Sequence, residues 1–152
     1  MVVGYQHGYA DASFMVFGSD GAQKPLSADT LFPVASISKL ATALGILALV
    51  DAGKLTLETL IGEVVPDIHQ AMHQRPLYTL LCHTSGYALD LPNKEGRYAH
   101  GLEWTKLAQE CLTTAPIHNT NQQVQYSNLG YGILGIIIER LTGLVFSDAI
   151  QR

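Results

Sequence analysis

The sequence predicts an α+β protein in which antiparallel strands pack on a buried helix and a mostly helical region follows. Three observations indicate this class: two short β-favouring runs open the 152-residue chain, a strongly apolar helix comes next, and the remaining pattern is helical. Hydrophobic residues make up 47% of the chain and charged residues 14%, as in folded globular domains. We therefore expect one domain over residues 1–152, with the strands and the apolar helix in 1–53 and the helical region in 54–152.

The first element is a predicted β-hairpin. Residues 2–7 and 12–17 are rich in β-favouring side chains, and residues 8–11 separate them as a turn. A second turn, residues 18–21, ends this segment. An isolated hairpin is marginal in water and needs further strands or a covering layer. We therefore expect that part of the sheet is missing from this chain.

A helix is predicted from Ser36 to Asp51. This stretch contains no proline and one glycine, residues 31–35 form an extended entry, and Gly53 stands where a left-handed helix stop belongs. The apolar side chains surround the helix axis and do not form one stripe, so we expect a central helix that is buried on all sides. These side chains are Ile37, Leu40, Ala41, Ala43, Leu44, Ile46, Leu47, Leu49 and Val50.

Helical segments are predicted for most of the remaining chain. The clearest covers residues 103–112, and a strongly apolar helix is predicted over residues 129–141, ended by Gly143. A short extended connection, residues 124–128, precedes that helix. Between residues 55 and 112 the expected breaks are Gly62, Pro66, Pro76, Gly86, Pro92 and Gly101.

Charge and hydropathy exclude two classes of partner. The formal net charge is -4 and Lys plus Arg total 9, so we expect no basic face for nucleic acid. The longest apolar stretches, residues 40–50 and 129–138, are shorter than the roughly 18 residues of a membrane span. No basic segment precedes an apolar core in residues 1–7, so no signal peptide is expected, and the compartment stays open. The two cysteines, Cys82 and Cys111, are expected to be buried thiols.

The start of the predicted helix carries a possible nucleophile. Ser36-Ile37-Ser38-Lys39 places a hydroxyl and an amine three residues apart, so both project from one side of a helical turn. The apolar helix partly desolvates the lysine and favours its neutral, proton-accepting form, which a serine needs in order to act as a nucleophile. The helix N-terminus also favours negative charge that develops nearby. The alternative is structural, with Ser36 capping the helix and Lys39 extending to solvent.

A second motif with suitable chemistry is Tyr126-Ser127-Asn128. In an extended connection, side chains two residues apart face the same way, so the phenol and the amide can point to one site. The phenol can then relay protons, and the amide can hold a substrate carbonyl. The alternative is again structural, with Asn128 capping the next helix and Tyr126 serving as a core aromatic.

Three stretches together carry a resemblance to a known family. They are residues 30–39 with their continuation at 51–55, the turn Leu81-Cys82-His83-Thr84-Ser85-Gly86, and Tyr126-Ser127-Asn128. In this order they resemble the nucleophile motif, the L-x-H-T-S-G turn and the second catalytic motif of the serine β-lactamase-like superfamily. That superfamily includes class C β-lactamases, D-Ala-D-Ala peptidases and related esterases. Tyr126 follows Ser36 by 90 residues, and this separation fits the class C and esterase branch.

The resemblance implies a role for each candidate residue. Ser36 is then the acylated nucleophile, Lys39 and Tyr126 share the proton transfers, and Asn128 orients the substrate amide or ester. We interpret residues 83–86 as structural, a helix stop with local hydrogen bonds. The implied substrate is a small molecule, either a β-lactam, a D-Ala-D-Ala-type peptide or a small ester, and no cofactor or metal is expected.

One element of the family pattern is missing. The third motif, a K-T-G or H-x-G triplet on a sheet edge strand, has no counterpart in this sequence. In the family it supplies one backbone N–H of the oxyanion hole while the nucleophile supplies the other, and losing one such donor typically costs about a hundredfold to a thousandfold in rate. We therefore expect a truncated domain whose remaining strands follow Arg152, with an open sheet edge that promotes self-association or recruits a companion chain. The alternative function is a non-catalytic or stoichiometrically acylated binding fragment.

A glycine pattern offers a rival function. Gly130, Gly132 and Gly135 match the G-x-G-x-x-G fingerprint of dinucleotide-binding proteins and open an apolar helix. The fingerprint expects an acid about 20 residues later, whereas Asp148 comes 13 residues after Gly135. Glycines that let a helix pack closely are the simpler interpretation.

A histidine pair offers a rival site. His69 and His73 could share one helix face as metal ligands, but no His-Glu-x-x-His pattern accompanies them. We expect them to lie on a solvated face.

Overall fold

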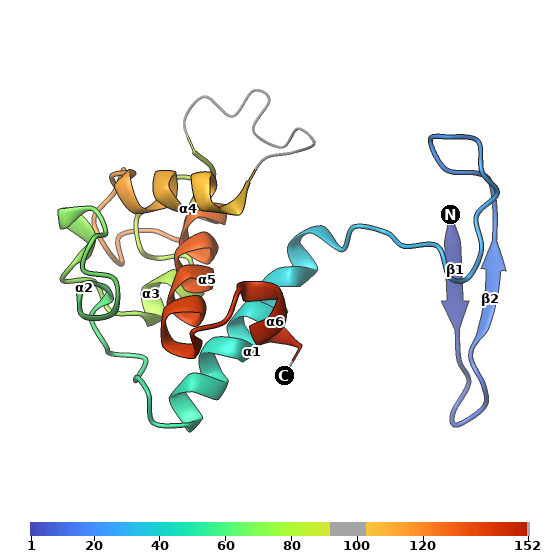
Figure 1. The fold of residues 1–152 in the computed structure, drawn as a ribbon, viewed down its shortest axis with the longest axis horizontal. Helices are drawn as coiled ribbons and strands as arrows, with labels where there is room; N and C mark the ends of the chain where they lie inside the picture. Colours follow the sequence, from blue (N-terminus) through green and yellow to red (C-terminus); the bar gives the residue numbers. More distant parts are fainter. Residues whose placement is uncertain (92–102, 152) are drawn as a thin grey trace. The chain divides into compact units, whose positions relative to one another are not determined.

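The computed structural model describes residues 1–91 and 103–151, and it divides the chain into two compact units, Met1–Ala35 and Ser36–Arg152 (Figure 1). The expected breaks at Pro92 and Gly101 lie outside the described residues. The boundary falls directly before Ser36. The predicted apolar helix therefore belongs to the same unit as the helical region that follows it.

The first unit contains the predicted hairpin. Strand β1 (Val2–Tyr5) pairs antiparallel with β2 (Ser13–Val16), and the register places Val2 opposite Val16. These are the only strands in the part of the chain that the structure describes. The unit is thus a two-stranded ribbon, and it lacks the third strand that usually makes such a sheet stable by itself. Its large apolar side chains remain exposed, namely Tyr5, Phe14, Met15 and Phe17.

The second unit begins with the predicted helix. Its first turn, Ala35–Ile37, is a 3-10 helix, and α1 (Ser38–Asp51) continues from it. Gly53 ends the helix with a φ of 67°, and its N–H donates to the carbonyl of Val50 at 2.9 Å. This left-handed conformation is the stop that the sequence predicted at this position.

Burial of α1 differs from the expectation. Only Thr42, Ile46 and Leu49 are buried, whereas the side chains of Leu40 and Leu44 are 63% and 57% exposed. Within the second unit, α1 is therefore buried on one side only. Helices α5 and α6 pack against one side of α1, and the described residues of this unit contain no strand that would cover the other side.

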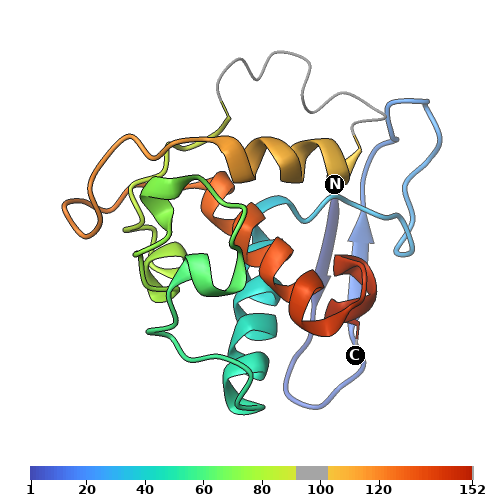
Figure 2. The same cartoon turned by 60° about the vertical axis from the view of Figure 1, so that its left-hand side comes forward.

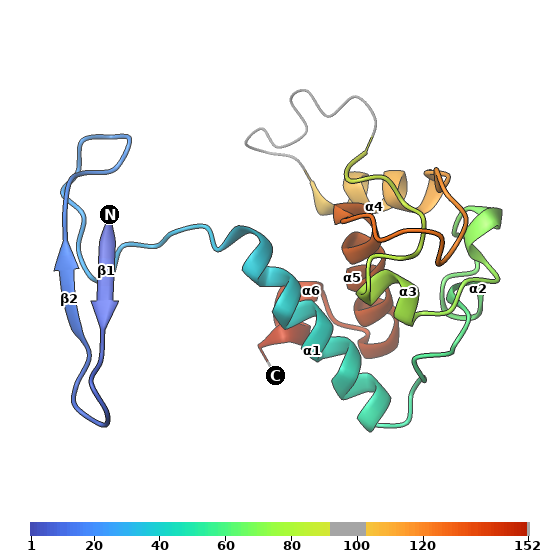
Figure 3. The ribbon, with the colours of Figure 1, turned by 180° about the vertical axis from the view of Figure 1, so that it is seen from behind.

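Helix α5 (Asn128–Thr142) is the centre of the second unit. It contacts α1, α3 (Tyr78–Leu81), α4 (Trp104–Thr113) and α6 (Phe146–Ile150), and Figures 2 and 3 show it running through the middle of these helices. The predicted stop at Gly143 is confirmed by its φ of 71°. The core around α5 includes Ile61, Met72, Leu77, Leu80, Leu129, Ile133, Leu134, Ile137 and Ile138.

Short helices connect α1 to α4. They are α2 (Ile61–Val64), the 3-10 helix Gln70–Met72 and α3, so the predicted helical segments are present but brief. Cys111 on α4 is buried as expected, and burial raises the pKa of its thiol to about 11. Cys82 is exposed because it stands at the C-terminal cap of α3, so the expectation of a buried thiol is wrong there. In the described residues, no helix has both the length and the apolar character needed to cross a membrane.

Candidate active site

Ser36 lies in the 3-10 turn at the entrance to α1, and its side chain is accessible. The hydroxyl of Tyr126 donates a hydrogen bond to Ser36 Oγ at 2.7 Å. Lys39 Nζ donates to the same oxygen at 3.5 Å, the outer limit for such a bond. Ser36 is not the N-cap residue, which is Ile37 and has no side-chain cap. The capping alternative for Ser36 is therefore not supported.

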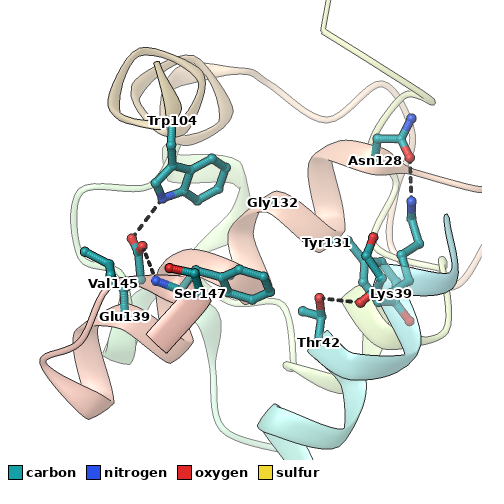
Figure 4. A pocket seen from close by; sticks show the side chains of 12 residues that line it. Lys39, Thr42, Trp104, Asn128, Tyr131, Gly132, Glu139, Val145 and Ser147 are labelled. Carbon is teal, nitrogen blue, oxygen red and sulfur yellow. Dashed lines mark hydrogen bonds between the residues drawn. The ribbon is translucent and has the colours of Figure 1, made fainter. Parts of the chain in front are cut away.

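Lys39 stands one turn along the helix and points inward. Its Nζ donates to Asn128 Oδ1 at 2.7 Å, as Figure 4 shows. The same nitrogen lies 4.8 Å from the ring centroid of Tyr126 and 5.6 Å from that of Tyr131. The amine is thus held between the two motifs and does not extend freely to solvent. The alternative in which Lys39 only reaches for water is not supported.

The Tyr126-Ser127-Asn128 segment is held by its middle residue. Ser127 is buried and caps α5, since its Oγ accepts from the Gly130 N–H at 3.0 Å and donates to the carbonyl of Ala88 at 2.7 Å. Its φ of -139° and ψ of 121° are extended, so Tyr126 and Asn128 face the same way. Because Ser127 provides the cap, Asn128 is left to interact with Lys39.

The positive charge of Lys39 makes Tyr126 more acidic. The hydrogen bond from Lys39 has the largest effect in lowering the pKa of Tyr126, and the bond to Ser36 lowers it further. Slight burial and the negative charge of Asp90 act in the opposite direction and are outweighed. The sequence alone does not determine whether nearby positive charge lowers the pKa of Tyr126 more than burial raises it. In the structure the effect of Lys39 is larger, and the pKa is lowered. A phenol made more acidic in this way can exchange a proton with Ser36 near neutral pH more readily than an ordinary tyrosine.

Two residues at this site were not expected from the sequence. Asp90 Oδ1 accepts from Asn128 Nδ2 at 2.7 Å, which orients the amide so that its oxygen faces Lys39. His83 accepts from the N–H of Ser127 through Nδ1 at 3.1 Å. The L-x-H-T-S-G turn was a signal for His83, although we interpreted it as a local helix stop. No pattern marked Asp90.

An apolar pocket of about 560 Å³ opens beside the site. It is bordered at one end by Lys39 and Asn128 and at the other by Trp104 and Val145 (Figure 4), and Phe146 also lines it. Trp104 is held by a hydrogen bond from its Nε1 to Glu139 Oε2 at 3.0 Å. Ser36 and Tyr126 do not line this pocket, so it extends from the lysine side of the site.

The rival glycine pattern serves helix packing. Gly130, Gly132 and Gly135 all lie inside α5 and not in a loop before it. A Cβ on Gly132 would stand 3.0 Å from the sulfur of Cys111, and one on Gly135 would meet Trp104 and Phe146 at 3.6 Å. These glycines permit close approach of α4 and of the segment that leads into α6. The phosphate-binding loop that the fingerprint requires is not formed.

The two histidines of the rival metal site have local structural roles. His69 Nδ1 accepts from the Ala71 N–H and caps the 3-10 helix Gln70–Met72, while His73 Nε2 is 3.0 Å from the carbonyl oxygen of Ile68. The segment is not one α-helix, so the two rings do not share a helix face as the pair would require. The described residues contain no cluster of three or more metal-ligating side chains.

Comparison with known proteins defines the family. The family model described as Beta-lactamase matches residues 2–152, and the chain belongs to this family. Penicillin-binding protein 4 of Amycolatopsis lactamdurans is 32% identical over 86% of this chain and 35% of its own length. Esterase EstB of Burkholderia gladioli is 31% identical over 86% of this chain and 37% of its own length. The crystal structure of D-amino acid amidase from Ochrobactrum anthropi SV3 matches with a TM-score of 0.79 and 26% identity, over 99% of this chain and 44% of that one.

The chain is short compared with these proteins. It spans about a third of the length of the curated relatives that it matches, from 29% to 37% in three of them. The family and the α+β fold, as predicted from the sequence motifs, are confirmed.

Proposed function

We propose that this chain carries the acylation half of a serine hydrolase site, with Ser36 as the nucleophile. The observation that carries the proposal is the 2.7 Å hydrogen bond between the Tyr126 hydroxyl and Ser36 Oγ, formed across 90 residues of sequence. A nucleophile and a proton acceptor within hydrogen-bond distance are the basic requirement of covalent catalysis. Lys39 contributes the positive charge that stabilises the phenolate form of Tyr126.

The proposed acylation step moves one proton and exchanges one bond. Ser36 Oγ gives its proton to the phenolate oxygen of Tyr126 as it attacks the carbonyl carbon of the substrate. When the tetrahedral intermediate collapses, the bond to the leaving group breaks and the leaving group takes that proton. The acyl group then remains on Ser36 as an ester, and water cleaves it by the same proton route in reverse.

Asn128 is proposed to bind the substrate. Its amide is oriented by Lys39 on one side and Asp90 on the other, so its direction is set before a substrate arrives. Such a fixed amide can align a substrate amide or ester without paying for reorganisation. The names of the relatives suggest three substrate classes, namely β-lactams, D-amino-acid amides or peptides, and small esters.

A binding fragment that is acylated once is the second candidate. The sequence contains neither a K-T-G nor an H-x-G triplet, and by resemblance that triplet supplies a donor to the oxyanion hole. Without the donor, acylation by a reactive compound remains possible, while hydrolysis of the acyl-enzyme slows by about a hundredfold to a thousandfold.

Intact-mass measurements over time test both candidates. The chain is incubated with a fluorescent penicillin and, separately, with a nitrophenyl ester, and the acylated fraction and the released product are followed. A serine hydrolase gives an adduct that forms and decays with continuing product release. A binding fragment gives a stable adduct with either compound, and with the ester it releases one equivalent of nitrophenol. No adduct with either compound, or an unchanged adduct in Ser36→Ala, would refute the proposal.

A further inference from the structure

His83 forms hydrogen bonds with both neighbours of Tyr126 in the sequence. The carbonyl oxygen of His83 accepts from the N–H of Gln125 at 2.8 Å. Its ring nitrogen Nδ1 accepts from the N–H of Ser127 at 3.1 Å. Tyr126 is therefore bracketed by two hydrogen bonds to one residue. The His83 ring also lies against the Tyr126 ring, with centroids 4.6 Å apart.

His83 is itself set firmly at the end of α3. Its backbone φ is 59°, the left-handed region that few residues other than glycine adopt, with asparagine, aspartate and histidine the most tolerant. The N–H groups on both sides of it are bonded: that of Cys82 to the carbonyl of Tyr78 at 2.9 Å, and that of Thr84 to the carbonyl of Thr79 at 2.9 Å. The acceptor atoms of His83 are thus fixed relative to the core helix that carries Tyr78.

The hydrogen bond from the Ser127 N–H to His83 Nδ1 requires a neutral imidazole. Nδ1 faces an N–H donor, so it must be unprotonated, and the ring proton must be on Nε2. Protonation would place two donors face to face and remove the bond to Ser127. The charged and titratable groups that face the ring are Lys39 from α1, Tyr126 from the adjoining connection and Tyr131 from α5, whose ring centroid is 5.1 Å away. Burial first, and then the positive charge of Lys39, lower the pKa of His83 below its ordinary value of 6.5.

We propose that His83 is a positioning residue for the proton transfer by Tyr126, and that it acts only as the neutral imidazole with Nδ1 as acceptor. This inference rests on the proposed function. The Tyr126 side chain is 40% exposed. The two bonds to His83 keep its hydroxyl at the distance from Ser36 at which a proton can be exchanged. A displacement of a reacting group by about 1 Å can slow a reaction by about a hundredfold.

Two substitutions distinguish the effect of the acceptor atom from the effect of the imidazole ring. His83→Asn keeps an acceptor atom bonded to the same side-chain carbon and tolerates the left-handed backbone, but it cannot titrate. His83→Leu keeps apolar bulk and has no acceptor. The test is the rate at which a fluorophosphonate phosphonylates Ser36, with loss of fluoride, as a function of pH in the native chain and in both variants. Urea denaturation establishes that each variant folds.

The expected result has three parts. His83→Leu acylates about a hundredfold more slowly, while His83→Asn stays within about threefold of the native rate at neutral pH, which is less than 1 kcal/mol of barrier. Below the lowered pKa of His83, the logarithm of the native rate falls with a slope approaching two, because Tyr126 and His83 must both be deprotonated; above that pKa the slope is one. The slope in His83→Asn is one. If His83→Leu does not fold, the slope in His83→Asn decides, and a slope still approaching two would overturn the inference.

An NMR measurement separates failure of the inference from failure of the proposed function. If the native chain is labelled at Ser36 and His83→Leu is labelled equally fast, the inference is wrong and the proposed function stands. If the native chain is not labelled, the proposed function is wrong. The positioning role is then tested by the rate of hydrogen exchange at the Ser127 amide. Slow exchange in the native chain and in His83→Asn, with fast exchange in His83→Leu, supports the role. Equal exchange rates in all three chains overturn it.

Discussion

Removing the hydroxyl of Ser127 should destabilise the second unit and disturb the site at the same time. Ser127 is 1% exposed and its Oγ makes two hydrogen bonds, one accepted from the Gly130 N–H and one donated to the carbonyl of Ala88. The residue stands between Tyr126 and Asn128. The substitution Ser127→Ala removes both bonds and adds no bulk.

The magnitude follows from those two bonds. Loss of a serine N-cap typically costs about 1 kcal/mol of stability, within a range of roughly 0.5–2 kcal/mol. Loss of the bond to Ala88 leaves its carbonyl without this partner in a part-buried setting and adds about 1 kcal/mol. We therefore predict that the free energy of unfolding falls by about 2 kcal/mol.

Urea denaturation followed by circular dichroism measures this change. A shift of the midpoint with an unchanged dependence on urea concentration is expected, because the surface exposed on unfolding stays the same. Ser147→Ala is the matched control, since that side chain is exposed and its hydroxyl bonds the exposed neighbour Asp148 at 3.3 Å. We expect the control to change stability by less than about 0.5 kcal/mol. Equal stability of the two variants would contradict the role assigned to Ser127.

Four further predictions follow from named contacts. Tyr126→Phe should slow acylation of Ser36 by about a hundredfold or more, measured with a fluorescent penicillin, and a native rate would return this residue to a packing role. Asp67→Asn should cost up to about 1 kcal/mol, because two bonds at 2.6 and 2.8 Å join its carboxylate to Arg140 at a partly exposed position. The hydrogen bond to Arg140 lowers the pKa of Asp67 below its ordinary value of 3.8. The stabilisation by this ion pair should therefore be present above pH 3.8 and be lost as the pH falls through the lowered pKa. A destabilisation by Asp67→Asn that persists below that pKa would argue against this account. Gly86→Ala should prevent native folding or destabilise the chain by several kcal/mol. A Cβ at this position would collide with the backbone carbonyl oxygen of His118, and the φ of 85° disfavours any residue other than glycine. A small change in the thermal unfolding temperature would contradict this prediction. We predict that the chain self-associates through the exposed side of α1, where Leu44 is 57% exposed, and that Leu44→Lys reduces this association. Sedimentation showing the same state in both chains would refute the prediction.

The helices that frame the site could be predicted because their signals are local. The apolar run of α5 ends at Gly143, whose left-handed φ of 71° is the conformation that glycine favours at a helix end. Helix α1 could be predicted from the extended entry at residues 31–35, from the absence of proline after it, and from the stop at Gly53. In each case a few adjacent residues determine the result.

Contacts between distant segments could not be predicted in the same way. The one-sided cover of α1 depends on which elements pack against it, and an apolar pattern does not contain that information. The roles of His83 and Asp90 depend on hydrogen bonds to residues 44 and 38 positions away. The resemblance placed Ser36, Lys39, Tyr126 and Asn128 in one site, and the structure brings these four side chains together.

Peptide mapping of a covalent serine adduct tests the central claim most directly. The chain is labelled with a fluorophosphonate, digested, and analysed by tandem mass spectrometry, with Ser36→Ala as the control. We predict one adduct, on Ser36, and no labelling of the variant, because Ser36 is the accessible serine whose Oγ contacts Tyr126 and Lys39. An adduct on Ser38, Ser85 or Ser127, or equal labelling of the variant, would contradict the account.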